Sequence, residues 1–254
     1  MNPFEGKVAL ITGGNAGIGR ATAIGFARLA AKVVISGRRE NEGHQVVEEI
    51  KASGGDAIFV KTDVSKERDV AAMVRQTVAT FGRLDFAFNN AGISGGDSTP
   101  PTVDYGLDLW QKVININLSG VYYCLRAQIP AMLKNGGGAI VNTSSGAAVT
   151  ASRGQPGYTA AKYGVLGLTK LAAQETAVTG VRVNAILPGM TRTPLFGSWA
   201  AEHPDHAEAL AATVPVGRMA SPAEVAEAAV WLCSSRASYV NGLSLVIDGG
   251  LSIR

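Results

Sequence analysis

A glycine-rich turn near the start of the chain constrains the fold more than any other stretch. It spans residues 12–19 (TGGNAGIG) and lies between a short apolar run, Lys7–Thr12, and a helical stretch, Arg20–Ala30. A second apolar run, Lys32–Ser36, follows. Short apolar runs of this kind are typical of strands buried on both faces of a parallel sheet. The sequence therefore predicts a strand–turn–helix–strand unit, the context in which a glycine motif indicates a dinucleotide site.

The glycines of this turn have distinct physical roles. Gly13 permits the tight turn, while Gly17 and Gly19 let the backbone approach a pyrophosphate and let the helix pack closely on the sheet. The amides of the first helical turn then face the phosphates. The glycine spacing is Gly-x-x-x-Gly-x-Gly. We expect the cofactor to contact this turn, including Asn15 and Ile18.

The end of the second predicted strand bears on the choice of cofactor. An Asp or Glu usually binds a free ribose 2′-hydroxyl at this position. Here the chain reads Ser36-Gly37-Arg38-Arg39, and the first acid, Glu40, comes too late. Gly37 leaves room, and Arg38 can bind a 2′-phosphate through two hydrogen bonds. We predict NADP(H) over NAD(H); solvated surface arginines are the alternative.

Strands and helices alternate along the rest of the chain. This alternation predicts an α/β fold of Rossmann type, a doubly wound, seven-stranded parallel sheet with helices on both faces, in a single domain over residues 1–254. The further predicted strands are Ala57–Lys61, Leu84–Phe88, Ala139–Thr143, Val181–Ile186 and Leu243–Ile247, and the further helices are Glu42–Ser53, Glu67–Phe81, Trp110–Met132, one containing Tyr158–Lys170, and one opening with capping residues at Ser221–Glu224.

Several predicted strands end in residues suited to a ligand crevice, because ligands of open α/β sheets bind at the carboxyl ends of the strands. Asn90, Ala91 and Gly92 follow the fourth strand, and Asp63 and Val64 follow the third, where an adenine ring would lie. Asp63 either hydrogen-bonds the adenine amino group or caps the helix that follows it.

A tyrosine and a lysine one helical turn apart are candidates for acid–base chemistry. Tyr158 and Lys162 share a helix face if this stretch is helical. A free tyrosine has a pKa of about 10, too high for ready proton exchange near neutrality. An ammonium about 4 Å away, at an effective dielectric of about 20, is worth roughly 4 kcal/mol, or at most about three pKa units. Such pairs also occur by chance on solvated helices, so their significance depends on the other motifs.

From Lys7 to Gly250 the chain resembles the short-chain dehydrogenase/reductase family. The motifs lie in the expected order between the expected strands. They are Thr12-Gly13 with Gly17-Ile18-Gly19, Asn89-Asn90-Ala91-Gly92, Asn117, Ser145, Tyr158 with Lys162, Pro188-Gly189, and Asp248-Gly249-Gly250.

The resemblance implies four catalytic residues. Tyr158 would be the acid/base that exchanges a proton with the substrate oxygen, and Ser145, rather than its neighbour Ser144, would hydrogen-bond that oxygen. Lys162 would lower the pKa of Tyr158 and hold the nicotinamide ribose hydroxyls. Asn117 would anchor a water that links Lys162 to solvent.

The resemblance also implies further cofactor contacts. Thr191 and Thr193 would contact the nicotinamide amide. Asn15 stands where some NADP-dependent members carry a basic residue, so the choice of cofactor would rest on Arg38, with Arg39 as a second candidate.

The expected reaction is hydride transfer between NADP(H) and a carbonyl compound or secondary alcohol. The alternatives on this scaffold are reduction of a 3-oxoacyl thioester on a carrier protein and oxidation of a sugar or steroid. A cofactor-sensing regulator without turnover is a third alternative, although an intact Ser145, Tyr158 and Lys162 set argues against it. The resemblance suggests a homotetramer.

Residues 190–216 are predicted to form a substrate lid. The apolar stretch Pro194–Trp199 lies beside the expected nicotinamide site, with Gly189 and Gly197 as candidate hinges. Packing as ordinary core or at a subunit contact is the alternative. Closure on substrate would favour an apolar or moderately polar carbonyl compound.

Composition and charge argue against other classes of function. The net charge is +3 and the chain has no block of Lys and Arg residues, which disfavours binding to nucleic acid. The sequence contains no run of about 18 apolar residues, so no membrane-spanning helix is expected. Cys124 and Cys233 lie far apart in apolar segments, and no signal peptide opens the chain, so we expect a cytoplasmic protein. His203 and His206 lie in a segment that reads as solvated, so no metal site is expected.

Overall fold

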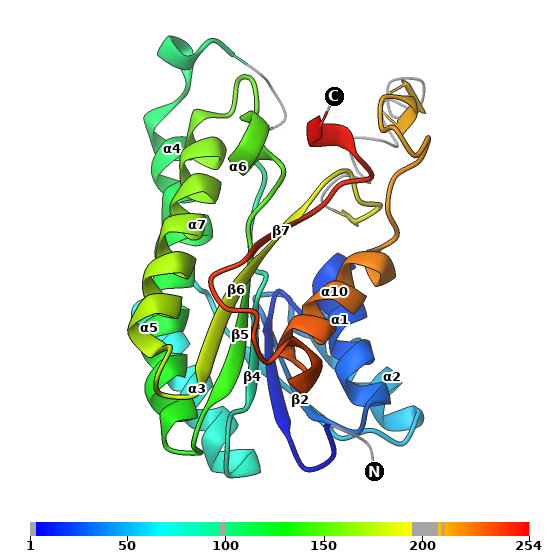
Figure 1. Ribbon diagram of the computed structural model, residues 1–254, viewed down its shortest axis with the longest axis vertical. Coiled ribbons are helices and arrows are strands. Elements are labelled where there is room, and N and C mark those ends of the chain that lie inside the picture. The colour runs from blue at the N-terminus through cyan, green and yellow to red at the C-terminus, as the bar shows by residue number, and fades with distance from the viewer. Residues whose placement is uncertain (1–3, 97–99, 195–207, 210, 254) are drawn as a thin grey trace.

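The structure is a computed structural model that describes residues 4–96, 100–194, 208–209 and 211–253. Its centre is a parallel sheet of seven strands in the order β3-β2-β1-β4-β5-β6-β7. Helices cover both faces of this sheet (Figure 1). The predicted fold class, a doubly wound seven-stranded parallel sheet, is confirmed.

The predicted strands and helices are found with small shifts at their ends, except that the helix predicted over Trp110–Met132 is divided. The strands are β1 (Val8–Thr12), β2 (Lys32–Gly37), β3 (Ala57–Lys61), β4 (Phe86–Asn89), β5 (Gly138–Thr143), β6 (Val181–Pro188) and β7 (Ser244–Ile247). The helices whose bounds fall within the described residues are α1 (Gly17–Arg28), α2 (Glu40–Ala52), α3 (Glu67–Phe81), α4 (Leu107–Ile114), the π-helix η2 (Asn115–Ser119), α5 (Gly120–Leu133), α6 (Ala147–Thr150), α7 (Pro156–Thr176) and α10 (Pro222–Cys233), with short 3₁₀ turns at Thr102–Asp104, Ser235–Ala237 and Leu251–Ile253.

Alternate side chains of β1 to β5 fill two separate cores. In β1, Ala9 and Ile11 pack in the core beneath α1, α2 and α10, whereas Val8 and Leu10 pack in the core beneath α3, α5 and α7. Figure 1 shows these two groups of helices on opposite sides of the sheet. Burial of a large apolar side chain contributes about 1.5–3 kcal/mol, so both layers stabilise the sheet that carries the loops at its ends.

The region predicted as one helix over Trp110–Met132 is divided into three parts. A π-helical turn, Asn115–Ser119, joins α4 to α5. Within it Asn117 is fully buried, and its amide donates to the Ile93 carbonyl and accepts from the Ile93 N–H, both at 2.9 Å. A π turn contains one extra residue, and apolar periodicity alone does not reveal such an insertion.

The start of α10 matches the capping residues predicted from the sequence. Ser221 Oγ accepts from the Glu224 N–H at 3.4 Å, and Glu224 Oε2 accepts from the Ser221 N–H at 2.8 Å. Among the residues that the structure describes, none of the helices has both the length and the apolar character needed to cross a bilayer.

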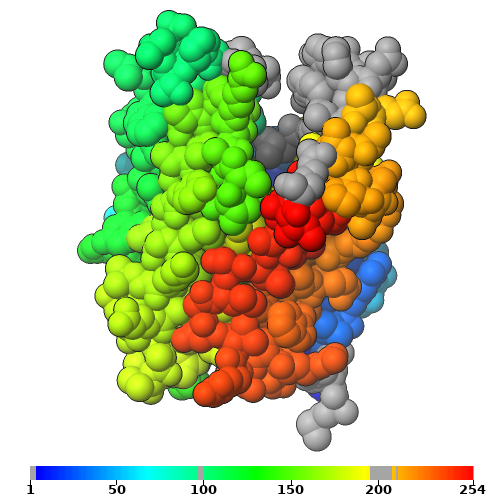
Figure 2. Space-filling model, turned by 45° about the horizontal axis from the view of Figure 1, so that its top comes forward, coloured from blue at the N-terminus to red at the C-terminus, as the bar shows by residue number. Residues whose placement is uncertain are grey.

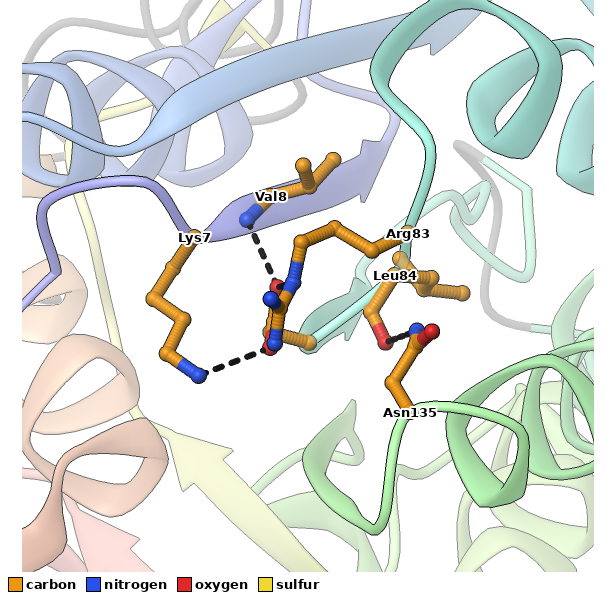
Figure 3. A network of polar contacts seen from close by, with 6 residues as sticks. Lys7, Val8, Arg83, Leu84 and Asn135 are labelled. Carbon is orange, nitrogen blue, oxygen red and sulfur yellow. Dashed lines mark hydrogen bonds and ion pairs between the residues drawn. The ribbon is translucent and has the colours of Figure 1, made fainter.

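A buried carboxylate joins the amino ends of two central strands. Asp85 precedes β4 and accepts from the Val8 N–H at 3.0 Å, from Arg83 Nε at 2.7 Å and from Lys7 Nζ at 3.2 Å. Figure 3 shows Lys7, Val8 and Arg83 converging on this group, beside the Leu84–Asn135 hydrogen bond. Burial by itself raises the pKa of Asp85, but these hydrogen bonds outweigh it and hold the pKa below its usual value.

We predict that Asp85→Asn lowers the free energy of unfolding by about 2–3 kcal/mol at pH 7, because Lys7, Val8 and Arg83 lose a charged acceptor. The folded pKa lies below the unfolded value of about 3.9, so this stabilisation is present above about pH 4. It is lost as the pH falls through the folded pKa, and the penalty of the variant shrinks there. Urea unfolding at pH 7 and again below about pH 4 measures the free energy of unfolding of both proteins and tests the effect.

The control is Asp56→Asn, since Asp56 is an exposed acid that lies 3.9 Å from Lys32 Nζ. We expect it to change the free energy of unfolding by less than about 0.5 kcal/mol. An equal penalty for both variants, or a penalty of Asp85→Asn that persists at low pH, would contradict the assignment.

Candidate active site

A cavity of about 680 Å³ lies at the carboxyl ends of the strands. Its lining comes from the β1–α1 turn, the segments after β2, β3, β4, β5 and β6, and the start of α7. Figure 2 shows this end of the molecule hollowed between the green α6–α7 side and the orange-to-red C-terminal side. Of the residues predicted to act in the site, all but Gly19 and Asn117 line this cavity.

The glycine turn forms one wall of the cavity. Gly13 and Gly17 have positive φ angles of 64° and 52°, which side chains other than glycine rarely adopt. A side chain at Gly19 would collide with the Gly13 carbonyl and with Asn90. Ala16, at the N-cap of α1, offers no side-chain acceptor, so the first-turn amides remain available for an anion.

The start of the loop after β4 is fixed to this turn. Thr12 Oγ1 accepts from the N–H groups of Asn90 and Ala91 at 3.0 and 3.1 Å. The Asn90 amide donates in return to the carbonyls of Thr12 and Gly13 at 3.3 and 3.4 Å. The floor of the cavity is therefore held by hydrogen bonds between the ends of β1 and β4.

The two arginines after β2 have different surroundings. When the amide of Asn15 is oriented with its oxygen toward Arg39, that oxygen accepts from Arg39 Nε and Nη2 at 3.0 and 3.1 Å. The Glu42 carboxylate lies 3.4 Å from Arg39 Nη1. Arg38 is exposed, lines the cavity and has no hydrogen bond or ion pair within the described part of the chain. A Cβ at Gly37 would lie 2.8 Å from the Asn15 amide, so the small residue there makes room for Asn15.

Asp63 and Val64 line the cavity after β3. Asp63 Oδ1 accepts from the N–H and Oγ of Ser65 at 3.1 and 2.7 Å, while α3 begins at Glu67 with Lys66 as its N-cap. The alternative of helix capping by Asp63 is therefore wrong. Burial raises the pKa of Asp63, but the Ser65 hydrogen bonds and the positive charge of Arg38 lower it below its usual value.

The serines after β5 face different partners. Ser144 Oγ is buried and donates to the Lys162 carbonyl at 2.8 Å, which ties the end of β5 to α7. Ser145 lines the cavity beside Tyr158, where its hydroxyl favours the ionised form of the phenol, and it accepts from the Ala147 N–H at 3.2 Å. The geometry thus directs Ser145, and not Ser144, toward the tyrosine.

Lys162 is almost fully buried against the tyrosine ring. Its Nζ lies 5.5 Å from the centroid of the Tyr158 ring and donates to the Thr143 carbonyl at 2.9 Å. A cation over an aromatic face is attracted by the ring quadrupole. Burial lowers the pKa of Lys162 to about 8, so the amine is mainly protonated at pH 7.

The expected lowering of the Tyr158 pKa is not found in this structure. Burial, the largest influence, raises the pKa of Tyr158, and the nearby Ser145 hydroxyl offsets only part of the rise. Helical spacing correctly placed Lys162 on the same face, but its amine lies over the ring and is directed to the Thr143 carbonyl. The phenol is therefore protonated near neutral pH.

Asn117 supports the site from outside the cavity. The Ile93 backbone uses one N–H and one lone pair of its amide, and the anchoring of a water by Asn117 stays a prediction. A Cβ at Gly92 would lie 3.1 Å from Asn117 Oδ1 and 3.8 Å from Lys162 Nζ. Asn117 thus holds the segment after β4 beside Lys162.

Two threonines line the part of the cavity wall that the segment after β6 forms. Thr191 is buried and its hydroxyl donates to the Gly189 carbonyl at 3.1 Å. Thr193 faces the glycine turn, since a Cβ at Gly17 would lie 3.1 Å from its methyl group. Thr193 therefore lies where the loop after β6 meets the start of α1.

Some lining residues carried no recognisable signal in the sequence. Gln155, Ser94 and Ile116 line the cavity but lie outside every motif. Gln155 directly precedes Pro156, the first residue of α7, so only the position of that helix start would have indicated it.

Two other expectations concern segments that are largely outside the described residues. Apart from Pro194, the stretch Pro194–Trp199 of the expected lid lies there, as do His203 and His206. Within the described ranges, no group of three or more His, Cys, Asp or Glu residues could hold a metal ion.

Known proteins resemble this chain over nearly its whole length. A family described as Enoyl-(Acyl carrier protein) reductase matches residues 13–252. An A-factor type gamma-butyrolactone 1'-reductase (1S-forming) of Streptomyces virginiae is 44% identical over 248 residues, which cover 97% of this chain and 96% of the relative. A cyclohexanol dehydrogenase of Acinetobacter sp. (strain SE19) is 42% identical over 248 residues, covering 98% and 96%.

A solved structure agrees in fold as well. The 3-ketoacyl-(acyl-carrier-protein) reductase from Brucella melitensis, complexed with NADH, is 36% identical with a TM-score of 0.90, covering 98% of this chain and 99% of that one. With the sheet order and the cavity, these similarities show that the chain belongs to the short-chain dehydrogenase/reductase family, whose members bind a nicotinamide cofactor, and that it is an oxidoreductase acting on alcohols or carbonyl compounds.

Proposed function

We propose that the protein transfers a hydride between NADP(H) and a small ketone or secondary alcohol, with Tyr158 as acid/base. The observation that carries the proposal is that one cavity is lined by the glycine turn, by Arg38 and by the Ser145, Tyr158 and Lys162 set. Cofactor-binding and proton-transfer groups thus lie at the same edge of the sheet.

The residues present fit a nicotinamide dinucleotide. The uncapped amides at the start of α1 suit a pyrophosphate, and the glycines leave the space that side chains would fill. Asp63 and Val64 would border the adenine, and Thr191 and Thr193 the nicotinamide amide. When bound, the nicotinamide supplies or accepts the hydride.

In the direction of reduction, the chain's own residues deliver the proton. Ser145 would hydrogen-bond the substrate oxygen and orient it toward the Tyr158 hydroxyl. Burial keeps the phenol protonated, and the charged Lys162 beside its ring would stabilise the phenolate as the proton leaves. Lys162 is almost fully buried and Tyr158 is half-buried, so water screens the interaction between them less than it would on the surface.

Support for NADP(H) comes from the unpaired Arg38. Arg39 is held by Asn15 and Glu42, whereas the guanidinium of Arg38 is unpaired within the described part of the chain and lines the cavity. A 2′-phosphate would offer Arg38 charge-assisted hydrogen bonds that a 2′-hydroxyl cannot match. Arg39 would contribute mainly charge.

The relatives guide the substrate class. One is named a cyclohexanol dehydrogenase and another a gamma-butyrolactone 1'-reductase. We infer a cyclic or similarly compact ketone or alcohol for this chain. A single-domain homotetramer in the cytoplasm, with a lid over residues 190–216, stays a prediction from the sequence.

A second candidate function is reduction of a 3-oxoacyl thioester on a carrier protein. It is favoured by the description of the matching family and by the name of the solved neighbour. Rates with a carrier-bound thioester and with a free cyclic ketone, compared at equal concentration, would separate the two candidates.

We predict that Tyr158→Phe lowers kcat for ketone reduction by at least about 100-fold, because general acid catalysis typically contributes about 10²–10⁴-fold. The Kd for NADPH should change little, since the ring that packs against Lys162 remains. Tyr163→Phe, an exposed tyrosine on the same helix, is the control and should keep normal turnover. Near-normal kcat for Tyr158→Phe would refute the assignment.

We predict that Arg38→Ala raises the Kd for NADPH by about 10–100-fold, which corresponds to the loss of charge-assisted hydrogen bonds. The Kd for NADH should stay unchanged, and fluorescence titration measures both. Arg68→Ala, an exposed arginine on α3, is the control. A wild-type preference for NADH would overturn the choice of cofactor.

We predict that kcat/KM for reduction falls as the pH rises through about 8, because Lys162 then loses the charge that stabilises the phenolate. The raised pKa of Tyr158 keeps the proton donor intact over this range. Initial rates from about pH 6 to about pH 10 test the profile. An increase through this range would contradict the proposed role of Lys162.

A further inference from the structure

Gln155 lies in the cavity next to the reacting groups but has no role in the chemistry described above. It is the N-cap residue of α7, three positions before Tyr158, and it lines the same cavity as Ser145 and Ser94. Its side chain is half-buried. It is therefore within the wall that a substrate held at Tyr158 would face.

The Gln155 amide is held in a defined orientation. Its Nε2 donates to the Gly96 carbonyl at 3.2 Å, and its Oε1 accepts from Ser152 Oγ at 3.2 Å. A carbonyl can only accept, so the Gly96 contact fixes which end of the amide is nitrogen. Close packing adds to this, because a Cβ at Gly95 would lie 2.8 Å from Gln155 Cβ.

The segment opposite Gln155 is fixed as well. Tyr105 is buried, and its hydroxyl donates to the Gly95 carbonyl at 2.8 Å. The carbonyls of Gly95 and Gly96 are thus each held by a side chain from another part of the chain. Gln155 consequently presents its amide from a rigid wall, which lowers the entropic cost of using it to bind a ligand.

The amide has hydrogen-bonding capacity that these contacts do not use. A glutamine amide offers two N–H donors and two lone pairs on its oxygen. The hydrogen bonds within the described part of the chain occupy one donor and one lone pair. Counted over the residues that the structure describes, one N–H and one lone pair remain on a side chain that lines the cavity.

We propose that Gln155 is a specificity-determining residue that recognises a second oxygen on the substrate. The preferred substrates are then compact ketones or secondary alcohols with a further carbonyl or hydroxyl group, over hydrocarbon ketones. The proposal deepens the proposed function and rests on it. A site built to hydrogen-bond such a group rejects the analogue that lacks it, because its own polar atoms are then left unpaired.

The test compares cyclohexanone with 1,2- and 1,4-cyclohexanedione at saturating NADPH. We expect the wild-type enzyme to show a higher kcat/KM for at least one dione than for cyclohexanone. Gln155→Met keeps a similar volume but removes both polar atoms. It should lower kcat/KM for the preferred dione about tenfold or more, mainly through KM, and change that for cyclohexanone less than about threefold.

Two further variants complete the experiment. Gln155→Asn withdraws the amide by one methylene group and should also lose the preference for the dione, which keeps the test decisive if Gln155→Met does not fold. Gln174→Met, an exposed glutamine on the same helix, is the matched control and should keep wild-type values. The Kd for NADPH should be unchanged in all three.

The outcomes separate this proposal from the proposed function. Equal losses of kcat/KM for all three ketones in Gln155→Met would show that Gln155 only supports the wall. A wild-type kcat/KM for cyclohexanone that equals or exceeds the values for both diones would also overturn the proposal. Either result leaves the proposed function intact. No reduction of any of the three ketones by the wild-type enzyme would overturn the proposed function and this proposal together.

Discussion

The contact between Thr12 and Asn90 holds the point in the sheet where the strand order reverses. From β1 the chain proceeds to β2 and β3 on one side, and it returns to β4 on the other. Loops that leave adjacent strands in opposite directions open a crevice between them. The hydroxyl of Thr12 accepts from two amides of the loop after β4, so the two sides of this crevice stay in register. The positions of the phosphate-binding turn and the catalytic strand ends both depend on that register.

A chain of buried side-chain hydrogen bonds supports this edge from below. Asn89 exchanges hydrogen bonds with Gln128 of α5 and donates to Asn142 of β5, which donates to Thr169 of α7. All four side chains are almost completely buried. Because unpaired polar groups are costly at such depth, the network favours the one arrangement of strands and helices that satisfies every member. The loops after β4 and β5 begin directly above it.

The sequence predicted the strands well because their apolar runs are short and end in glycine or polar residues. It also identified most of the cavity lining, since the glycine turn and the Tyr158–Lys162 pair follow local rules of spacing. The π turn at Asn117 was not predicted, because apolar periodicity does not reveal one inserted residue and the Ile93 contact of Asn117 is distant in the sequence. The pKa of Tyr158 was misjudged for a similar reason: helical spacing gives the direction of the lysine, but burial depends on the whole fold. Pairing of Arg39 with Asn15 and the wall position of Gln155 likewise require three-dimensional neighbours.

The carboxylate network of Asp85 lies at the amino ends of the strands, whereas the cavity lies at their carboxyl ends. The sheet therefore separates the group that secures its central strands from the loops that meet a ligand. Substitutions in those loops leave this anchor in place. In this chain, thermal tolerance can accordingly be engineered at the amino-terminal rim of the sheet without altering selectivity at the carboxyl-terminal rim.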